Sequence, residues 1–269
     1  MAKRLQPPIK YFGGKNTMFK RILAEFPKPE DYDLYIEPFA GSYGIGLKII
    51  PTPTMEIYND LDKNVYSLYK VLQDAEMFAE FKRKCDFSYY SEDLRNEFRE
   101  GLKDSEISTV DRAFKFFYVN RTSHNGIGGF SINKYVRRGM SKSNSDFLSA
   151  IDRLPELHDR LARLIVTNKD GVELIEKHDG ERTMIYADPP YEQSTRTSAR
   201  YDVDMDRDKH IDFLNAVIKS KSKILISGYD CELYDPLEEN GFKKIAFNVN
   251  TVTGKREPKV KVETLWKNY

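Results

Sequence analysis

Short apolar runs alternate with helical periodicity along much of the chain. The runs 34–37, 55–58, 163–167, 183–187 and 223–227 have the length and composition of buried strands. Between them, Leu61, Val65, Leu68 and Leu72 recur at the three- and four-residue spacing of an amphipathic helix. A second helix is expected to begin at Asp170, in a sequence like a capping box, and a third to cover roughly 208–220. This alternation predicts an α/β fold with a doubly wound parallel sheet.

Two parts of the chain depart from this alternation. The runs 244–251 and 260–267 flank the turn-like Thr253-Gly254 and predict an antiparallel hairpin that closes the sheet. The stretch from about 73 to 160 is helical and charged at first, and is basic and rich in Gly, Asn and Ser through 124–145. We therefore expect one sheet domain made of 1–72 and 161–269, with 73–160 inserted as a second, mainly helical domain.

Composition excludes several classes of protein. None of the runs among the 269 residues reaches 18 apolar residues, so no membrane span is expected, and the basic N-terminus leads to no apolar segment of a secretion signal. Cys85 and Cys231 cannot make a disulfide framework. The four histidines lack metal-ligand spacing, so no metal is expected. These features favour a cytosolic protein.

Charge is segregated along the chain although its sum is small. The formal net charge is +1, yet residues 1–28 and 110–145 each carry +6, residues 241–269 carry +5, and the rest carries −16. Basic blocks of this kind can meet a polyanion such as nucleic acid. Ordinary solvated faces are the alternative interpretation.

Three motifs follow predicted strands, where the carboxyl ends of parallel strands meet. The segment 37–44 (EPFAGSYG) has small residues that let a ligand approach the backbone, or that simply make a tight turn. Asn59-Asp60 could accept hydrogen bonds from ribose hydroxyls, or cap the following helix. The segment 188–191 (DPPY) presents a carboxylate, carbonyl acceptors and an aromatic ring, which suits a planar group bearing an NH₂. A proline-rich turn is its alternative.

Together these motifs resemble the Dam-type (D12 class) DNA adenine-N6 methyltransferases, in the family's order and over nearly the whole chain. The segment 10–15 (KYFGGK) is similar to the family's N-terminal motif, 120–126 (NRTSHNG) resembles its N-R-x-x-x-N-G segment, and 262–269 resembles its closing strand. The resemblance implies a Rossmann-like S-adenosylmethionine-dependent methyltransferase sheet with an inserted DNA target-recognition domain. The implied reaction transfers a methyl group to the N6 amine of an adenine flipped out of double-stranded DNA.

The resemblance also implies roles for individual residues. The catalytic residues would be Asp188, Pro189, Pro190 and Tyr191. S-adenosyl-L-methionine would contact Tyr11, Lys15, Glu37, Phe39, Gly41, Ser42, Asp60, Asp170 and Asp188. DNA contacts are expected from Asn120, Arg121, Asn125, Lys134, Arg137, Arg138 and Lys142. The aromatic run Phe114, Phe116, Phe117 and Tyr118 is expected in the core of the insert.

Two positions depart from the family's pattern. Tyr43 stands where the second glycine of the cofactor loop belongs, and Gly128-Gly129-Phe130 stands where the family often has an arginine that reads DNA. The family's GATC specificity is therefore not carried over. Alternatives are a cytosine-N4 DNA methyltransferase, disfavoured by Asp188, a catalytically silent DNA-binding protein on the same fold, and an RNA or small-molecule methyltransferase. We expect a monomer or weak dimer in the cytoplasm of a bacterial or phage-infected cell, with a cognate restriction endonuclease as an optional partner.

Overall fold

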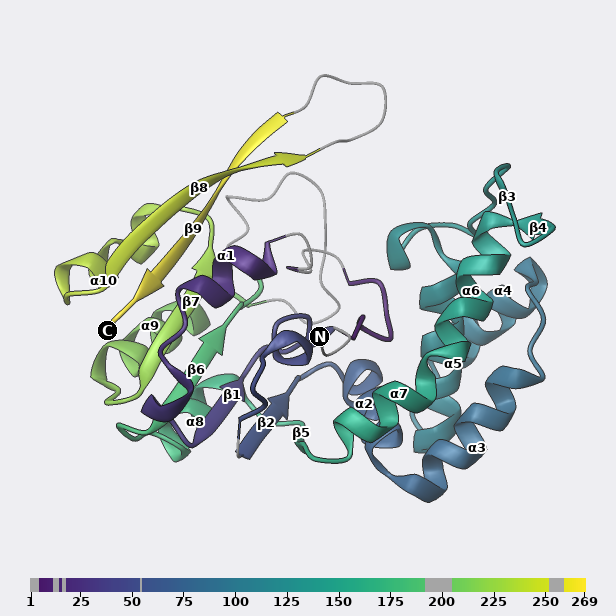
Figure 1. The fold of residues 1–269 in the computed structure, drawn as a ribbon, viewed down its shortest axis with the longest axis horizontal. Coiled ribbons are helices and arrows are strands. Elements are labelled where there is room, and N and C mark those ends of the chain that lie inside the picture. The colour runs from purple at the N-terminus through teal and green to yellow at the C-terminus, as the bar shows by residue number, and fades with distance from the viewer. Residues whose placement is uncertain (1–4, 12–14, 16–17, 54, 192–204, 252–258) are drawn as a thin grey trace. The chain divides into compact units, whose positions relative to one another are not determined.

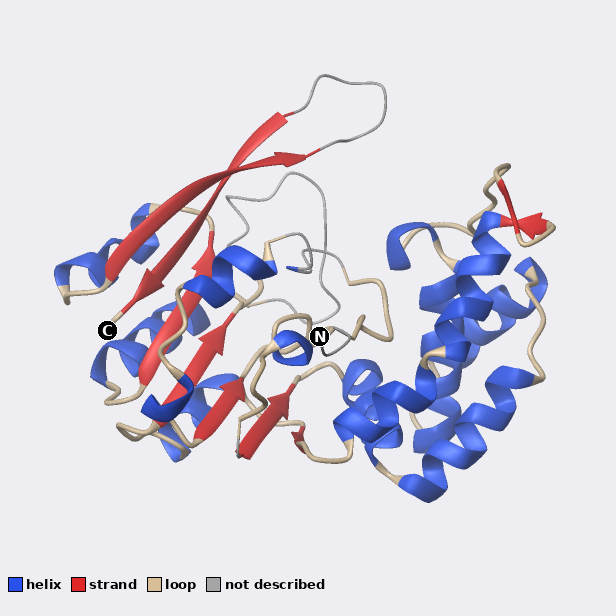
Figure 2. Cartoon of the chain, viewed as in Figure 1, coloured by secondary structure: helices blue, strands red, loops and turns tan. Residues whose placement is uncertain are grey.

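The computed structural model describes the chain except residues 1–4, 12–14, 16–17, 54, 192–204 and 252–258 (Figures 1 and 2). The chain divides into two compact units. The helical unit comprises Met1–Phe19, Gly41–Lys48 and Asp62–Asn168, and the sheet unit comprises Lys20–Ala40, Ile49–Leu61 and Lys169–Tyr269. This division differs from the expected insert of 73–160, because α2 (Lys63–Gln73) packs against α5 (Thr109–Thr122) and so belongs to the helical unit.

The sheet has seven strands in the order β5-β2-β1-β6-β7-β9-β8. Their bounds are β1 Leu34–Glu37, β2 Met55–Asn59, β5 Ile165–Thr167, β6 Thr183–Ala187, β7 Lys223–Gly228, β8 Lys243–Thr251 and β9 Lys259–Lys267. Strand β1 is parallel to both β2 and β6, and β6 is parallel to β7. Strand β9 is antiparallel to both β7 and β8. The expected doubly wound sheet with an antiparallel closing hairpin is confirmed.

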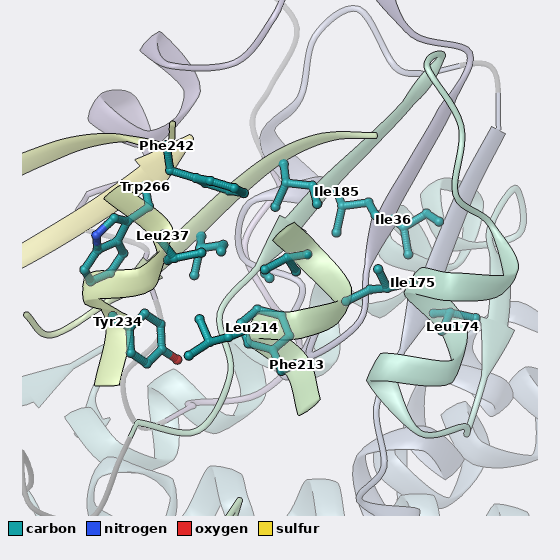
Figure 3. Close-up of a cluster of buried hydrophobic side chains, with 14 of the residues drawn as sticks. Ile36, Leu174, Ile175, Ile185, Phe213, Leu214, Tyr234, Leu237, Phe242 and Trp266 are labelled. Atoms are coloured by element: carbon teal, nitrogen blue, oxygen red, sulfur yellow. The ribbon is translucent and has the colours of Figure 1, made fainter. Parts of the chain in front are cut away.

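The centre of the sheet is buried on both faces, which explains why its strands are nearly continuous apolar runs. Ile36, Ile185 and Ile224 of neighbouring strands have no or almost no exposed surface. Helices α8 (Gly171–Lys177) and α9 (Arg207–Lys219) pack Ile175 and Phe213 into the same cluster (Figure 3). Two shorter α-helices, α1 (Phe19–Ala24) and α10 (Asp235–Glu239), also lie mainly in the sheet unit.

The helical unit is a bundle with a small hairpin at one end (Figure 1). Its helices are α2, α5, α3 (Ala75–Asp86), α4 (Glu92–Gly101), α6 (Lys142–Asp152) and α7 (Leu154–Leu161). The hairpin pairs β3 (Val136–Arg137) with β4 (Met140–Ser141). Phe117 and Tyr118 are fully buried and Phe114 and Phe116 are partly buried, which confirms that the aromatic run is core. Within the described residues, no helix is long and apolar enough to span a membrane.

Candidate active site

Acidic side chains stand at the carboxyl ends of three adjacent strands of the sheet unit. Glu37 ends β1, Asp60 follows β2 and Asp188 follows β6. The chain winds outward in opposite directions from β1 and β6, so the crevice between them is the switch point where open α/β sheets bind ligands. Glu37 and Asp60 are buried, and the Tyr35 hydroxyl donates to Oε1 of Glu37 at 2.7 Å. This edge can therefore accept hydrogen bonds and face a cation.

The DPPY segment is held from two neighbouring strands. The Ser227 hydroxyl at the end of β7 donates to Oδ1 of Asp188 at 2.8 Å. The Tyr191 hydroxyl donates to Oε1 of Glu263 in β9, and the Tyr191 ring meets Tyr229 edge to face with 4.5 Å between centroids. Burial, with Asp188 and Glu263 nearby, raises the pKa of Tyr191 well above its ordinary value, so the hydroxyl stays a donor. Sequence reasoning did not identify Ser227 or Glu263 as site residues.

Asn59 fixes the loop that follows β1. Its side chain is completely buried, and Nδ2 donates to the Pro38 carbonyl at 2.8 Å and to the Lys169 carbonyl at 2.9 Å. Its Oδ1 accepts from the Lys169 amide at 2.9 Å, and its backbone carbonyl accepts from the Ala40 amide at 2.9 Å. One amide side chain thus links the EPFA turn to the residue before Asp170.

The structure separates the capping roles from the candidate ligand roles. Helix α2 is capped by Asp62, whose Oδ1 accepts from the Asn64 amide at 2.7 Å, so Asp60 is not its cap. Asp170 does cap α8, because its Oδ1 accepts from the Val172 amide at 2.8 Å. Gly171 beside it lies under a ring, since a Cβ there would come within 2.6 Å of the Phe39 side chain.

The glycine-rich loop of 41–46 belongs to the helical unit. Gly41 has φ +48°, and a Cβ on it would lie 2.7 Å from the Tyr11 ring. Tyr43 also has a left-handed backbone, with φ 54°, which is the region that favours glycine. Its buried ring lies against Gly46, where a Cβ would come within 2.1 Å of the ring. A tyrosine thus adopts a backbone conformation typical of the glycine that the family has at this position, and Gly46 makes room for it.

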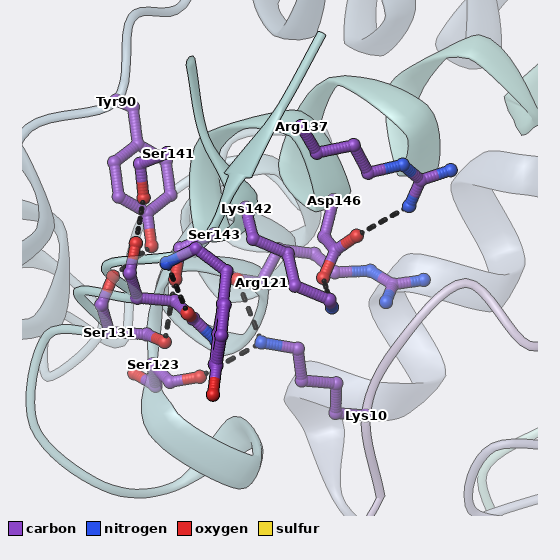
Figure 4. A network of polar contacts seen from close by, with 12 residues as sticks. Lys10, Tyr90, Arg121, Ser123, Ser131, Arg137, Ser141, Lys142, Ser143 and Asp146 are labelled. Atoms are coloured by element: carbon purple, nitrogen blue, oxygen red, sulfur yellow. Dashed lines mark hydrogen bonds and ion pairs between the residues drawn. The ribbon is translucent and has the colours of Figure 1, made fainter. Parts of the chain in front are cut away.

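The NRTSHNG segment holds the N-terminal KYFGGK segment. Asn120 is 4% exposed, its Oδ1 accepts from the Lys10 amide at 2.8 Å, and its Nδ2 donates to the Lys10 carbonyl at 2.8 Å. Gly126 has φ +87°, and a Cβ there would lie 2.5 Å from the Lys10 carbonyl oxygen. The Lys10 ammonium donates to the Ser123 carbonyl at 3.0 Å (Figure 4). Asn120 was expected to contact DNA, but its amide is occupied by the backbone of Lys10.

Two arginines support the same segment. Arg121 is partly buried and donates to the Pro7 carbonyl at 3.0 Å, and burial together with Arg153 lowers its pKa to about 10. Arg95 of α4 is 4% exposed and donates to the Ser123 hydroxyl at 3.0 Å and to the Gly128 carbonyl at 2.6 Å. The periodicity of α4 hides Arg95 among other charged residues, so the sequence carried no indication of this contact.

The remaining candidate DNA contacts lie on or near the β3–β4 hairpin. Asn125, Lys134, Arg137 and Arg138 are exposed and Lys142 is partly exposed. Arg137 and Lys142 both form ion pairs with Asp146 (Figure 4), and Nη1 of Arg138 lies 3.6 Å from Oδ2 of Asp152. Exposed apolar side chains accompany these cations: Ile132, Tyr135 and Val136 are each at least 75% exposed. The hairpin therefore presents cations and apolar groups together.

The strand order, the acidic carboxyl edge and the DPPY segment define a Rossmann-like α/β methyltransferase. Residues 11–256 match the D12 class N6 adenine-specific DNA methyltransferases, and the chain belongs to this family. The resemblance expected from the motifs is thus confirmed. Among the described residues, no three His, Cys, Asp or Glu side chains are grouped as metal ligands.

Two relatives are similar to the chain over most of its length. Type II methyltransferase M.MjaIII of Methanocaldococcus jannaschii is 24% identical over 277 residues, which cover 94% of this chain and 92% of that protein. Type II methyltransferase M.CviBI of Paramecium bursaria Chlorella virus NC1A is 24% identical over 250 residues, covering 89% and 90%. The similarity therefore includes both the sheet unit and the helical unit.

Proposed function

We propose that this protein transfers a methyl group from S-adenosylmethionine to the N6 amine of an adenine flipped out of duplex DNA. The observation that carries the proposal is the DPPY segment, which follows β6 beside the switch point in a chain of the adenine-specific family. Asp at position 188 favours adenine over the N4 amine of cytosine, as the family resemblance implies.

The DPPY segment supplies what an exocyclic amine needs to react. The lone pair of such an amine is delocalised into the ring, so the nitrogen is a poor nucleophile. The Asp188 carboxylate and the Pro189 carbonyl would each accept one amino hydrogen, which draws the nitrogen toward tetrahedral geometry and stabilises its developing positive charge. The Tyr191 ring would stack on the base, which offsets part of the unstacking cost of a few kcal/mol. Removal of the surplus proton follows transfer, so no strong base is required beforehand.

The residues fit S-adenosylmethionine in chemical type. When bound, this cofactor supplies an electrophilic methyl group on a positively charged sulfur. Asp60, which does not cap α2, is suited to accept from ribose hydroxyls, and Glu37 adds negative charge at the same edge. At Gly41 the Tyr11 ring takes up the space that a Cβ would need, so this glycine lets Tyr11 approach the backbone of the loop. We propose the remaining contacts from the motif match: Tyr11, Lys15, Phe39, Ser42, Asp170 and Asp188.

We propose that the hairpin and the NRTSHNG segment meet DNA. Lys134, Arg137, Arg138 and Lys142 are suited to phosphates, since most protein–DNA hydrogen bonds go to the backbone. Arg121 stays a candidate DNA contact from the motif match, although its guanidinium already donates to the Pro7 carbonyl. Asn125 stays a candidate contact because it is exposed. We assign Asn120 a positioning role, because both polar atoms of its amide are bound to Lys10.

The decisive experiment is methylation of a random duplex DNA library with S-adenosylmethionine, followed by sequencing for modified bases. We expect N6-methyladenine within one recognition sequence. N4-methylcytosine instead would favour the cytosine alternative, and no modification despite DNA binding would favour the silent binding protein.

Asp188→Ala should abolish methyl transfer and leave DNA binding largely intact, because the substitution removes the acceptor for the amine. Asp212→Ala is the matched control, since Asp212 is an exposed carboxylate of α9. Activity retained by Asp188→Ala would refute the mechanism.

The type II names of both relatives support a role in DNA modification beside a restriction endonuclease that recognises the same sequence. We also propose that the protein acts in the cytoplasm of a bacterial or phage-infected cell, where its DNA substrate would lie. DNA methylated by the protein should then resist cleavage by that endonuclease.

A further inference from the structure

Two side chains outside the DPPY motif reach its two reactive groups from adjacent strands. Ser227 is the residue before the last of β7 and is completely buried, and its hydroxyl contacts Asp188. Glu263 lies in β9, is 5% exposed, and accepts from the Tyr191 hydroxyl. Strands β7 and β9 are paired at this level, where Gly228 lies opposite Thr264. We propose that Ser227 and Glu263 are positioning residues for the proposed methyl transfer: Ser227 orients the Asp188 carboxylate and Glu263 orients the Tyr191 ring.

The contact at Asp188 has a direction. A serine hydroxyl has one proton, and Ser227 donates it to the carboxylate. The Tyr186 hydroxyl, 3.0 Å from the Ser227 oxygen, must then donate to Ser227. Tyr186 therefore supports Ser227, and Ser227 supports Asp188. Ser227 thus holds Oδ1 of the Asp188 carboxylate, and this contact restricts the orientation of the carboxylate.

The carboxylate that contacts Tyr191 belongs to Glu263, a charged residue buried in β9, and the pairing of this strand does not require a charge there. Leu265 and Trp266, two and three residues further along β9, are apolar and completely buried, so the strand can bury apolar side chains near this position. A buried charge is retained at a cost unless it is hydrogen-bonded. Glu263 holds the hydroxyl end of the ring, and Tyr229 meets the same ring edge to face. Two supports fix the plane of Tyr191, which is the plane on which a flipped base would stack.

A double-mutant cycle tests the role of Glu263. Tyr191→Phe keeps the ring and removes the donor, and Glu263→Gln keeps an acceptor and removes the charge. Each should lower kcat by about tenfold, Tyr191→Phe by removing the contact and Glu263→Gln by weakening it through the loss of charge. The double variant should be no worse than the poorer single variant, because both substitutions act on the same contact. Additive losses would overturn the role of Glu263. Thr264→Val is the control: Thr264 is buried next to Glu263 in β9, and its hydroxyl has no hydrogen-bond partner among the described residues, so activity should not change.

A fluorescent readout separates positioning from folding. With 2-aminopurine at the target position, fluorescence reports how the extruded base is stacked. Tyr191→Phe and Glu263→Gln should change the signal of the bound complex in the same direction, whereas Thr264→Val should not. Unchanged fluorescence in both variants would refute a fixed stacking plane, even if the two substitutions lowered the Tm of the protein.

The direction of the hydrogen bond from Ser227 to Asp188 predicts which substitutions lower kcat most. Ser227→Ala should lower kcat by about tenfold with unchanged DNA affinity, and Ser227→Thr, which keeps the hydroxyl, should restore much of it. Tyr186→Phe should have a smaller effect, because Ser227 can still donate to Asp188. A larger loss in Tyr186→Phe than in Ser227→Ala would overturn the proposed direction. Wild-type protein that methylates no DNA would refute the proposed function and both positioning roles together. If the wild-type protein is active but the losses in Tyr191→Phe and Glu263→Gln are additive, only the positioning role of Glu263 is refuted.

Discussion

At the scale of single residues, the cofactor loop shows how one departure from a family pattern is accommodated. Tyr43 has φ 54°, a conformation that costs about 1–2 kcal/mol for a residue with a Cβ. Its ring is completely buried, so packing offsets this strain. The same packing requires a glycine at position 46, where a Cβ would come within 2.1 Å of the ring.

Gly46→Ala should therefore lower the free energy of unfolding by about 1–3 kcal/mol, the usual cost of overpacking a core. Urea denaturation measures it. Gly129→Ala is the matched control, because a Cβ there meets none of the described residues within 4 Å, and it should leave stability unchanged or slightly raised. Tyr43→Gly leaves a cavity and destabilises by itself, but adding Gly46→Ala to that variant should cost little further stability, because the ring is gone. A further loss as large as that of Gly46→Ala in the wild-type protein would contradict this account.

The sequence identified the motif residues but not their supports. Asp188 and Tyr191 stand out because DPPY is contiguous, whereas Ser227 and Glu263 come from strands 36 or more residues away. Single-chain patterns carry no information on which distant side chains meet. The same limit applies to Arg95, and to Asn120, whose place in a DNA-recognition motif pointed to DNA although its partner is the backbone of Lys10. His210 is a further example, because nothing in the sequence indicated that this histidine of α9 is completely buried.

At the scale of elements, the helix caps decide between roles that the sequence left open. Asp170 caps α8 through Oδ1, as expected, and the resemblance gives the same residue a cofactor contact. The two roles differ in what they require. A cap needs a side-chain oxygen, which Asn supplies as well as Asp, whereas a carboxylate acceptor for the cofactor needs its charge.

Asp170→Asn should therefore keep the Tm of the wild type and weaken the affinity for S-adenosylmethionine, as measured by calorimetry. Asp170→Ala should lose both, with about 1 kcal/mol of stability lost with the cap. Asp62→Asn is the control, because Asp62 caps α2 and has no proposed ligand role. Unchanged cofactor affinity in Asp170→Asn would leave Asp170 with the capping role alone.

Strands were easier to predict than the membership of helices. The runs at 34–37, 183–187 and 223–227 were found because both faces of the sheet are buried. The run at 163–167 is longer than β5, which begins at Ile165, because Arg163 and Leu164 belong to the turn that follows the end of α7 at Leu161. The apolar spacing of α2 was correct, yet it could not show that its apolar face packs on α5.

At the scale of the whole molecule, the total charge conceals where cations are presented. Arg137 and Arg138 stand on the exposed hairpin, each beside an aspartate, so a phosphate would replace an exposed ion pair that contributes little to stability. Each phosphate contact releases counterions from DNA, and log affinity falls with log salt concentration by about 0.9 per contact.

Replacing both Arg137 and Arg138 by alanine should reduce that slope by about 1 to 2 and weaken binding to all sequences equally, if the two side chains contact phosphates. Fluorescence anisotropy with duplex DNA over a salt series measures the slope. Lys103→Ala is the control, since Lys103 is a still more exposed cation paired with Glu100 outside the hairpin, and it should not change the slope. A changed sequence preference with an unchanged slope would instead identify the two arginines as base readers. That outcome would move the reading of DNA sequence onto the hairpin, in a chain whose Gly128-Gly129-Phe130 lacks the family's usual arginine.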